Sequence, residues 1–333
     1  MIKAIDPNMK ENTTLADQTT AWFDLNRDEL RGVICHRDFT RLGSNPMISK
    51  GVDALSKHPS GLNITFNTDS SSIKVKASLI GAAYMAHMTS VATVGFDLYV
   101  KIGNRFVFLA TTKVNASSYE VTLLEGVVRK NRTYRLYFPL YQAVTEASLG
   151  LEASAHVEWV KKPQEKLVIY GTSISQGGCA SRPGLSYGAI LDRHLPYEVI
   201  NLGFSGSAHL EDGIVEVINS ISKKWLILEV EANNDNTIAE MIEPFLQKLN
   251  PGNIVLISHF PLTTSLLKPA EQERLNKNRL AQQAASRNII FVDGAKVLKR
   301  FGYEETVDGV HLNDIGFYAV ANYLERLIRK HDA

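Results

Sequence analysis

The sequence predicts an α/β protein with two parts, an antiparallel β-sandwich followed by a three-layer α/β/α domain. Two patterns of apolar residues lead to this prediction, because they divide the chain in half. Short runs that alternate between apolar and polar residues fill residues 20 to 160, whereas continuous apolar runs separated by helical segments fill the remainder. Alternation indicates strands buried on one face, and continuous apolar runs indicate strands covered on both faces. The length of 333 residues agrees with two domains.

The alternating runs of the first half predict a β-sandwich of the jelly-roll type. Turn-forming residues such as Gly103-Asn104 separate these runs. The expected strands lie at 61–66, 72–77, 105–109, 132–138 and 156–160. Lys161-Lys162-Pro163 is typical of a linker, so we place the β-sandwich domain at residues 1–162 and the second domain at residues 163–333.

The second half alternates regularly between strands and helices, which predicts a doubly wound parallel sheet of five strands. The expected strands lie at 166–171, 198–203, 225–230, 253–259 and 288–293. The expected helices lie at 185–194, 211–222, 238–249, 269–285 and 313–329, with Asn313 as the cap of the last one. Ligands of such sheets bind beyond the carboxyl ends of the strands.

Composition excludes several classes of protein. The hydrophobic fraction of 44% and the charged fraction of 21% are ordinary for a soluble globular protein, and no apolar run approaches the ~20 residues of a membrane-spanning helix. The net charge is +1 and the basic residues are scattered, so we expect no nucleic-acid or membrane partner. Met1–Asn8 has no secretory signal pattern, which favours a cytoplasmic location. Cys35 and Cys179 fall in different expected domains, and we expect both to be buried or idle thiols.

The candidate catalytic residues are Ser173, Asp308 and His311. Ser173 lies on the turn Gly171-Thr172-Ser173 directly after an expected strand, and Asp308 and His311 share a loop before the final helix. A serine hydroxyl becomes nucleophilic when a histidine takes its proton, and a carboxylate must orient that imidazole. Each piece alone suits an ordinary turn, but their combination at the ends of the first and last strands predicts a serine hydrolase. Ser175 is the alternative nucleophile, and we expect it to pack against the following helix instead.

An oxyanion hole can be assembled from turns that follow the neighbouring strands. The candidate donors are the backbone N–H groups of Ser173 and Gly206 and the side chain of Asn233. One such donor typically contributes ~3 kcal/mol of transition-state stabilisation. Asn234 is the alternative to Asn233 as the side-chain donor.

Gly171-Thr172-Ser173, Gly206, the Asn233-Asn234 pair and Asp308-x-x-His311 resemble, in this order, the four blocks of the SGNH (GDSL-like) hydrolase superfamily. The segment Gly177–Gly184 and the element Gly95-Phe96-Asp97-Leu98-Tyr99 resemble a subfamily with an N-terminal β-sandwich. The resemblance implies a flavodoxin-like catalytic domain and esterase activity without a metal or organic cofactor. Carbohydrate O-deacetylases and acyltransferases are among the relatives. In the third block, the spacing from the strand favours Asn233, whereas an Asn-Asp pair favours Asn234.

Three further groups of residues allow two interpretations each. Arg182 either supports the loop beside the site or contacts substrate oxygens. Asp97 and Tyr99 share a strand face that suits either sugar binding or structural packing. His58 and His87 lack a Cys, Asp or Glu at ligand spacing, so we expect no zinc site, although either loop could reach the interdomain cleft and influence the choice of substrate.

We therefore predict an intracellular esterase that removes a short acyl group, most simply acetyl, from a sugar or similar polyol. An acyltransferase would use the same residues. The alternative from another class is a catalytically silent carbohydrate-binding protein. The protein could also form a homo-oligomer.

Overall fold

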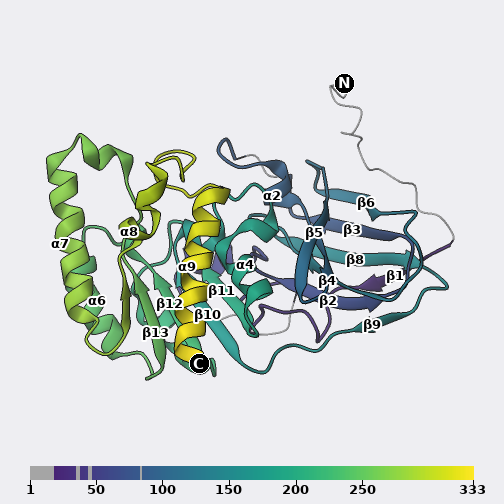
Figure 1. Cartoon of the computed structure of the whole chain (residues 1–333), viewed down its shortest axis with the longest axis horizontal. Coiled ribbons are helices and arrows are strands. Elements are labelled where there is room, and N and C mark those ends of the chain that lie inside the picture. The colour runs from purple at the N-terminus through teal and green to yellow at the C-terminus, as the bar shows by residue number, and fades with distance from the viewer. Residues whose placement is uncertain (1–18, 35–37, 44–46, 83–84) are drawn as a thin grey trace.

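The computed structural model describes residues 19–34, 38–43, 47–82 and 85–333. The expectations for Met1–Asn8 and for Cys35 lie outside the described residues. Figure 1 shows the β-sandwich and the α/β half side by side, with α4 (Tyr187–His194) between them.

The N-terminal half is a sandwich of two antiparallel sheets. The first has the order β1-β8-β3-β6, and the second has the order β5-β4-β7-β2-β9. Consecutive strands alternate between the sheets in the manner of a jelly roll, except that β4 and β5 form a hairpin within the second sheet. Side chains such as Phe66, Val75, Leu136 and Leu149 are fully buried in the core that both sheets share.

The bounds of the strands in this half are β1 Thr20–Asp24, β2 Asn63–Thr68, β3 Ile73–Leu79, β4 Asp97–Ile102, β5 Arg105–Thr111, β6 Ser118–Leu124, β7 Arg132–Tyr137, β8 Val144–Glu152 and β9 Val157–Trp159. Two short helices interrupt them, α1 (Lys50–Ser56) and α2 (Ser90–Val94).

The C-terminal half contains a parallel sheet with the order β11-β10-β12-β13-β14, which is the flavodoxin-like arrangement. Its strands are β10 Lys166–Gly171, β11 Glu198–Gly203, β12 Trp225–Glu229, β13 Asn253–Ile257 and β14 Ile290–Val292. The helices besides α4 are α3 Ser173–Gln176, α5 Asp212–Ser220, α6 Ile238–Gln247, α7 Pro269–Ala285, α8 Gly294–Leu298 and α9 Asp314–Asp332. The structure thus confirms the predicted fold class.

Two apolar cores lie on opposite faces of this sheet. Leu167 and Ile169 of β10 pack in a cluster with residues of α4 and α9, whereas Val168 and Tyr170 pack in a cluster with residues of α5 and α6. Because successive side chains of a strand point to opposite faces, the continuous apolar run serves both cores. Of the helices in the described part of the chain, none is both long and apolar enough to cross a membrane.

The register of the sheet brings three strand ends together. Gly171, at the end of β10, pairs with Gly203 at the end of β11 and with Glu229 at the end of β12. The turns that carry Ser173, Gly206 and Asn233 therefore leave the sheet at the same edge.

Buried polar contacts join the two halves. The Arg135 guanidinium on β7 donates to the Asp192 carboxylate on α4 at 2.6 Å, and the Tyr137 hydroxyl donates to the same oxygen at 2.6 Å. Arg41 is fully buried and donates to the carbonyl oxygens of Asn201 and Gly203 at 2.9 and 2.7 Å. Ion pairs and hydrogen bonds of this kind fix the orientation of the sandwich relative to the sheet.

Candidate active site

Ser173 is the first residue of α3, directly after the end of β10. Thr172 caps this short helix, and Gly177 ends it with a φ of 102°. Gly171 must lack a side chain, because a Cβ there would lie 2.5 Å from the carbonyl oxygen of Glu229 and 2.1 Å from the Ser175 hydroxyl oxygen. The tight strand-to-helix turn therefore presents Ser173 at the carboxyl edge of the sheet.

His311 and Asp308 lie in the loop before α9, which the Asn313 side chain caps. The Asp308 carboxylate accepts the backbone N–H groups of Val310 and His311 at 3.0 and 2.8 Å through one oxygen. Its other oxygen lies 2.7 Å from Nδ1 of His311. Desolvation opposes the charge of Asp308, but the hydrogen bonds from His311 outweigh it and lower the pKa of this carboxyl.

The structure brings the serine and the histidine together across 138 positions of sequence. Oγ of Ser173 lies 2.9 Å from Nε2 of His311. Because Asp308 accepts a hydrogen bond from Nδ1, the proton of a neutral ring lies on that nitrogen and Nε2 is free to accept from the serine hydroxyl. This chain of contacts has the arrangement that activates a serine nucleophile.

Ser175 is placed quite differently from Ser173. It is fully buried, and its hydroxyl donates to the Glu229 carboxylate at 2.9 Å and lies 2.7 Å from the Tyr187 hydroxyl. A buried side chain with these partners supports the turn and does not face a substrate.

The two asparagines of the third block have different surroundings. Asn234 is buried, and its side-chain amino group donates to the carbonyl oxygens of Ala208 and Val230 at 2.8 and 2.7 Å. Asn233 is half-buried and uses its side-chain carbonyl to accept the N–H of Ala208 at 3.3 Å. Since this bond occupies the oxygen of Asn233, its amino group points elsewhere and can donate to a ligand.

Gly206 lies in an exposed turn after β11 with a φ of 66°. This left-handed backbone conformation favours glycine, because residues with a side chain rarely adopt it. The N–H of Gly206 is therefore a candidate donor at the edge of the sheet where Ser173 lies.

Glu229 is a residue of the site that the sequence interpretation did not single out. It is buried at the end of β12, and one oxygen accepts the Thr172 N–H at 3.2 Å and hydroxyl at 2.8 Å besides the Ser175 hydroxyl. Burial raises its pKa to about 7, although the hydrogen bonds from Thr172 and Ser175 act in the opposite direction. Its only sequence signal is a carboxylate at the end of an apolar strand.

The β-sandwich contributes to the surroundings of the nucleophile. The Tyr141 hydroxyl, which precedes β8, donates to the carbonyl of Ser173 at 3.3 Å. A Cβ at Gly178 would lie 2.9 Å from that hydroxyl oxygen and 3.5 Å from Cδ2 of His311. His87 also reaches the site, with its ring centre 5.5 Å from that of His311. Both halves of the chain therefore contribute side chains to the surroundings of Ser173.

The remaining candidate residues are structural. Arg182 donates to the Asp97 carboxylate at 2.8 Å and to the Tyr99 hydroxyl at 2.6 Å, and the Gly184 N–H donates to the same carboxylate at 2.8 Å. Asp97 and Tyr99 are buried, so the structure contradicts the sugar-binding alternative for this strand face. The Gly-x-Asp-Leu-Tyr element instead docks the β-sandwich onto the loop that follows the nucleophile.

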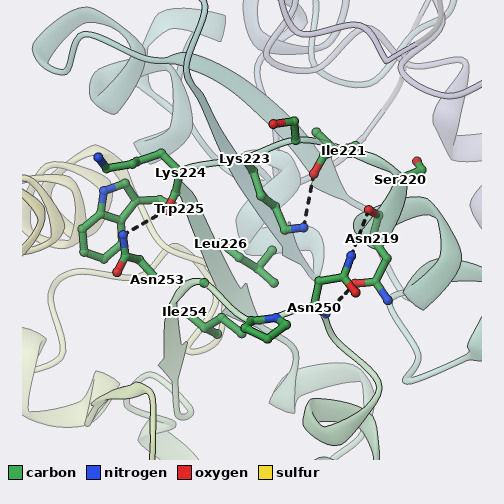
Figure 2. Close-up of a pocket in the computed structure, with 13 residues that line it drawn as sticks. Asn219, Ser220, Ile221, Lys223, Lys224, Trp225, Leu226, Asn250, Asn253 and Ile254 are labelled. Atoms are coloured by element: carbon green, nitrogen blue, oxygen red, sulfur yellow. Dashed lines mark hydrogen bonds between the residues drawn. The ribbon is translucent and has the colours of Figure 1, made fainter.

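A hollow of about 380 Å³ lies at the opposite, amino end of the sheet. Figure 2 shows several of its polar side chains bonded to nearby groups, such as the Asn253 amide, which donates to the Lys224 carbonyl at 3.2 Å. Trp225 and Asn253, which line the hollow, begin β12 and β13, whereas Ser173 follows the end of β10. Ligands of doubly wound sheets bind at the carboxyl ends, so the Ser173 edge is the candidate active site.

Comparison with models of protein families shows which family the chain resembles in each half. Residues 164–329 match the model of the GDSL-like lipase/acylhydrolase family, and residues 20–157 match the model of the N-terminus of SGNH hydrolase-type esterases. The chain belongs to the GDSL-like lipase/acylhydrolase family. Together the two models cover most of the sequence, which confirms the resemblance in both halves. Membership of this GDSL-like family supports an acyl-ester hydrolase.

Solved structures of similar architecture span nearly the whole chain. A protein described as a GDSL-like lipase from Bacteroides ovatus has 26% identity and a TM-score of 0.85, with 93% of this chain and 97% of that chain covered. A salicylyl-acyltransferase from a tetracycline biosynthetic pathway has 18% identity and a TM-score of 0.76, with 96% and 99% covered. An acetyl xylan esterase from Butyrivibrio proteoclasticus has 12% identity and a TM-score of 0.54, with 93% and 99% covered. A search of curated proteins found none that matches this GDSL-like chain.

Proposed function

We propose that this protein is a serine esterase that removes a short acyl group, most simply acetyl, from an oxygen of a carbohydrate or similar small polyol. The observation that carries the proposal is the continuous chain from the Ser173 hydroxyl through His311 to Asp308, with contacts of 2.9 and 2.7 Å.

In the proposed reaction, Ser173 Oγ attacks the ester carbonyl while His311 Nε2 takes the hydroxyl proton. Asp308 holds the ring and stabilises the imidazolium that forms. His311 then gives the proton to the leaving alkoxide, and an acyl-enzyme remains. Water attacks this intermediate with the same histidine as base, and Ser173 is regenerated.

The oxyanion of each tetrahedral intermediate would accept hydrogen bonds from the N–H groups of Ser173 and Gly206 and from the Asn233 side chain. Ser173 is in the first turn of α3, where backbone N–H groups have no acceptor within the helix. The exposed Gly206 turn and the orientation of the Asn233 amide agree with these roles. Such donors act on the charge that develops in the transition state.

Two features support a short acyl group on a polar alcohol. The Tyr141 hydroxyl and the Ser173 carbonyl leave no space for a side chain at Gly178, so the turn packs tightly against the β-sandwich next to the nucleophile. Asp308, Gly206 and His87 are exposed around the site, so an alcohol portion there would remain in contact with polar groups and water. An acetyl xylan esterase and other carbohydrate esterases share the fold, which is compatible with this substrate class.

The test is hydrolysis of p-nitrophenyl acetate, butyrate and octanoate by the wild type and by Ser173→Ala, followed by acetate release from a panel of acetylated sugars. We expect activity to decline with acyl length and to vanish in the variant. Equal activity of the variant would contradict the proposed nucleophile, and a preference for octanoate would contradict the short acyl group.

The similarity to a salicylyl-acyltransferase makes transfer to an alcohol the second candidate. Adding a polyol acceptor to the acetate ester assay distinguishes the two functions. A hydrolase releases free acetate in its presence, whereas a transferase forms the acetylated polyol and releases little acetate.

A further inference from the structure

Three side chains with metal-binding atoms converge next to the candidate nucleophile. His87 comes from the β-sandwich, Cys179 follows α3, and His311 precedes α9. One ligand atom from each lies within 4.8 Å of the other two. The spacing of these residues in the sequence gave no indication of this cluster, because the domain interface assembles it.

The cluster matches the ligands and the size of a zinc site. Zinc prefers thiolate sulfur and imidazole nitrogen, and bond lengths of 2.0 to 2.3 Å in a tetrahedral site place its ligand atoms about 3.5 Å apart. The atoms of the cluster need to approach by about 1 Å to reach that spacing. His87 is exposed and can supply this movement, whereas Cys179 is buried and His311 is held by Asp308.

The Asp308 carboxylate gives the cluster a second feature of zinc sites. Histidines that bind metals almost always donate their other ring N–H to a carboxylate, a backbone carbonyl or water, which fixes the tautomer and the ring orientation. The Asp308 carboxylate accepts such a hydrogen bond from Nδ1 of His311 at 2.7 Å. The lone pair of Nε2 is therefore directed away from Asp308, and an ion would compete for it with the Ser173 hydroxyl at 2.9 Å.

Cys179 has an unusual backbone conformation. Its φ of 74° lies in the left-handed region, which residues with a side chain rarely adopt. The surrounding turn holds it there, with the Gly178 N–H donating to the Ser173 carbonyl at 2.7 Å and the Ala180 N–H donating to the Gly177 carbonyl at 3.1 Å. This conformation places the sulfur beside His311, whereas the thiol has no part in the proposed ester hydrolysis.

We propose that His87, Cys179 and His311 form a binding site for Zn²⁺ or a similar soft divalent ion, and that the bound ion inhibits the enzyme. The ion takes the lone pair of His311 Nε2, which is the atom that must accept the proton of Ser173. Binding of the ion is independent of the proposed esterase function, whereas inhibition rests on it.

Binding is tested with Co²⁺ as a spectroscopic probe on the full chain. We expect wild type and Ser173→Ala to develop the sulfur-to-cobalt charge-transfer band, and Zn²⁺ to displace it. Cys179→Ser should lose the band, while Cys35→Ser, which alters the chain's other cysteine, should keep it. No band in wild type, or a band that Cys179→Ser retains, would overturn the site whether or not the protein hydrolyses esters.

Inhibition is tested with Zn²⁺ in the p-nitrophenyl acetate assay, with each variant compared to its own rate without metal. We expect reversible inhibition of wild type that EDTA relieves, and no inhibition by Mg²⁺, which prefers oxygen ligands. Loss of a partner in such sites costs about 10- to 100-fold in affinity, so His87→Gln and Cys179→Ser should need at least about 10-fold more Zn²⁺ for half-inhibition. His156→Gln, an exposed histidine outside the cluster, should respond as wild type does. Half-inhibition of all four proteins at the same Zn²⁺ concentration would overturn the proposal.

Discussion

At the scale of single residues, the two asparagines after β12 provide a matched pair of variants that separates a role in catalysis from a role in stability. Asn233→Ala should lower kcat by about 100-fold or more, because it removes a donor to the oxyanion, while the free energy of unfolding changes little. Asn234→Ala should instead lower the free energy of unfolding by about 1 to 3 kcal/mol, because the buried carbonyls of Ala208 and Val230 lose their donor. Steady-state kinetics and urea unfolding of both variants measure the difference. A larger loss of kcat in Asn234→Ala would reverse the assignment.

Glu229 makes the stability of the protein depend on pH. Its pKa is about 7 in the folded protein and 4.5 in the reference state, so between these values the folded state holds a proton that the unfolded chain releases. Stability is therefore highest below the lower value and falls as the pH rises through the upper one. The free energy of unfolding of wild type relative to Glu229→Gln should fall by about 2.5 kcal/mol between about pH 5 and about pH 8. A constant difference between the two proteins, measured by urea unfolding, would show that the carboxyl is not protonated on folding.

The sequence predicts Ser173, Asp308 and His311 because their chemistry and local spacing are recorded in short segments. Glu229 could not be found in that way, and for His87 the sequence indicated only that its loop could reach the cleft between the halves. The role of Glu229 depends on the register that pairs it with Gly171, and the position of His87 depends on how the β-sandwich meets the sheet. Neither relation leaves a pattern in one segment of the sequence.

At the scale of elements, β4 and the loop before α4 are joined by the pair of Asp97 and Arg182. Asp97 has no exposed side-chain surface and Arg182 has little, so removal of the acidic partner leaves a cation without compensation. Asp97→Asn should lower the free energy of unfolding by about 3 kcal/mol. It should also lower kcat, because the same loop contacts the start of α9 through Ser181, whose hydroxyl donates to Asp314 at 2.6 Å.

The control is Asp212→Asn, which breaks the exposed pair of Asp212 and Lys248. An exposed pair of this kind contributes about 0 to 1 kcal/mol. If both variants lose the same small amount in urea unfolding, the buried pair does not hold the loop.

The elements that the sequence predicts best are those with long apolar patterns. The predicted bounds of β10, β11 and α7 agree with the structure, and Asn313 caps α9 as expected. The short helices α2, α3 and α8 were not predicted, because four or five residues do not complete enough turns to show a helical period. For α3, tertiary contacts with Glu229 determine the structure of the turn.

At the scale of the whole molecule, the buried contacts between the halves predict cooperative unfolding. Asp192 of α4 is paired with Arg135 and Tyr137 of β7, and the Arg41 guanidinium donates to carbonyls of β11. A fragment of residues 163–333 would expose the interface and leave the Asp192 carboxylate without these partners. We therefore expect one transition for the intact chain in urea, followed by circular dichroism and tryptophan fluorescence, and no stable fold for the fragment. Two separate transitions, or a folded fragment that hydrolyses p-nitrophenyl acetate, would contradict this view.

The change of apolar period along the sequence predicts a β-sandwich half and a parallel-sheet half, and the jelly-roll and flavodoxin-like strand orders agree with this prediction. How the halves dock does not follow from any period. It depends on a few buried polar residues whose roles no sequence pattern indicates. The sequence therefore does not predict which residues of the β-sandwich lie beside Ser173, whereas the structure shows them.

The activation of Ser173 by His311 and Asp308 can be tested by covalent labelling with a fluorophosphonate followed by tandem mass spectrometry of the labelled peptide. We expect one adduct, located on Ser173, that is absent in Ser173→Ala and forms far more slowly in His311→Ala. An adduct on Ser175 or elsewhere, or labelling of Ser173 at the same rate without His311, would contradict it.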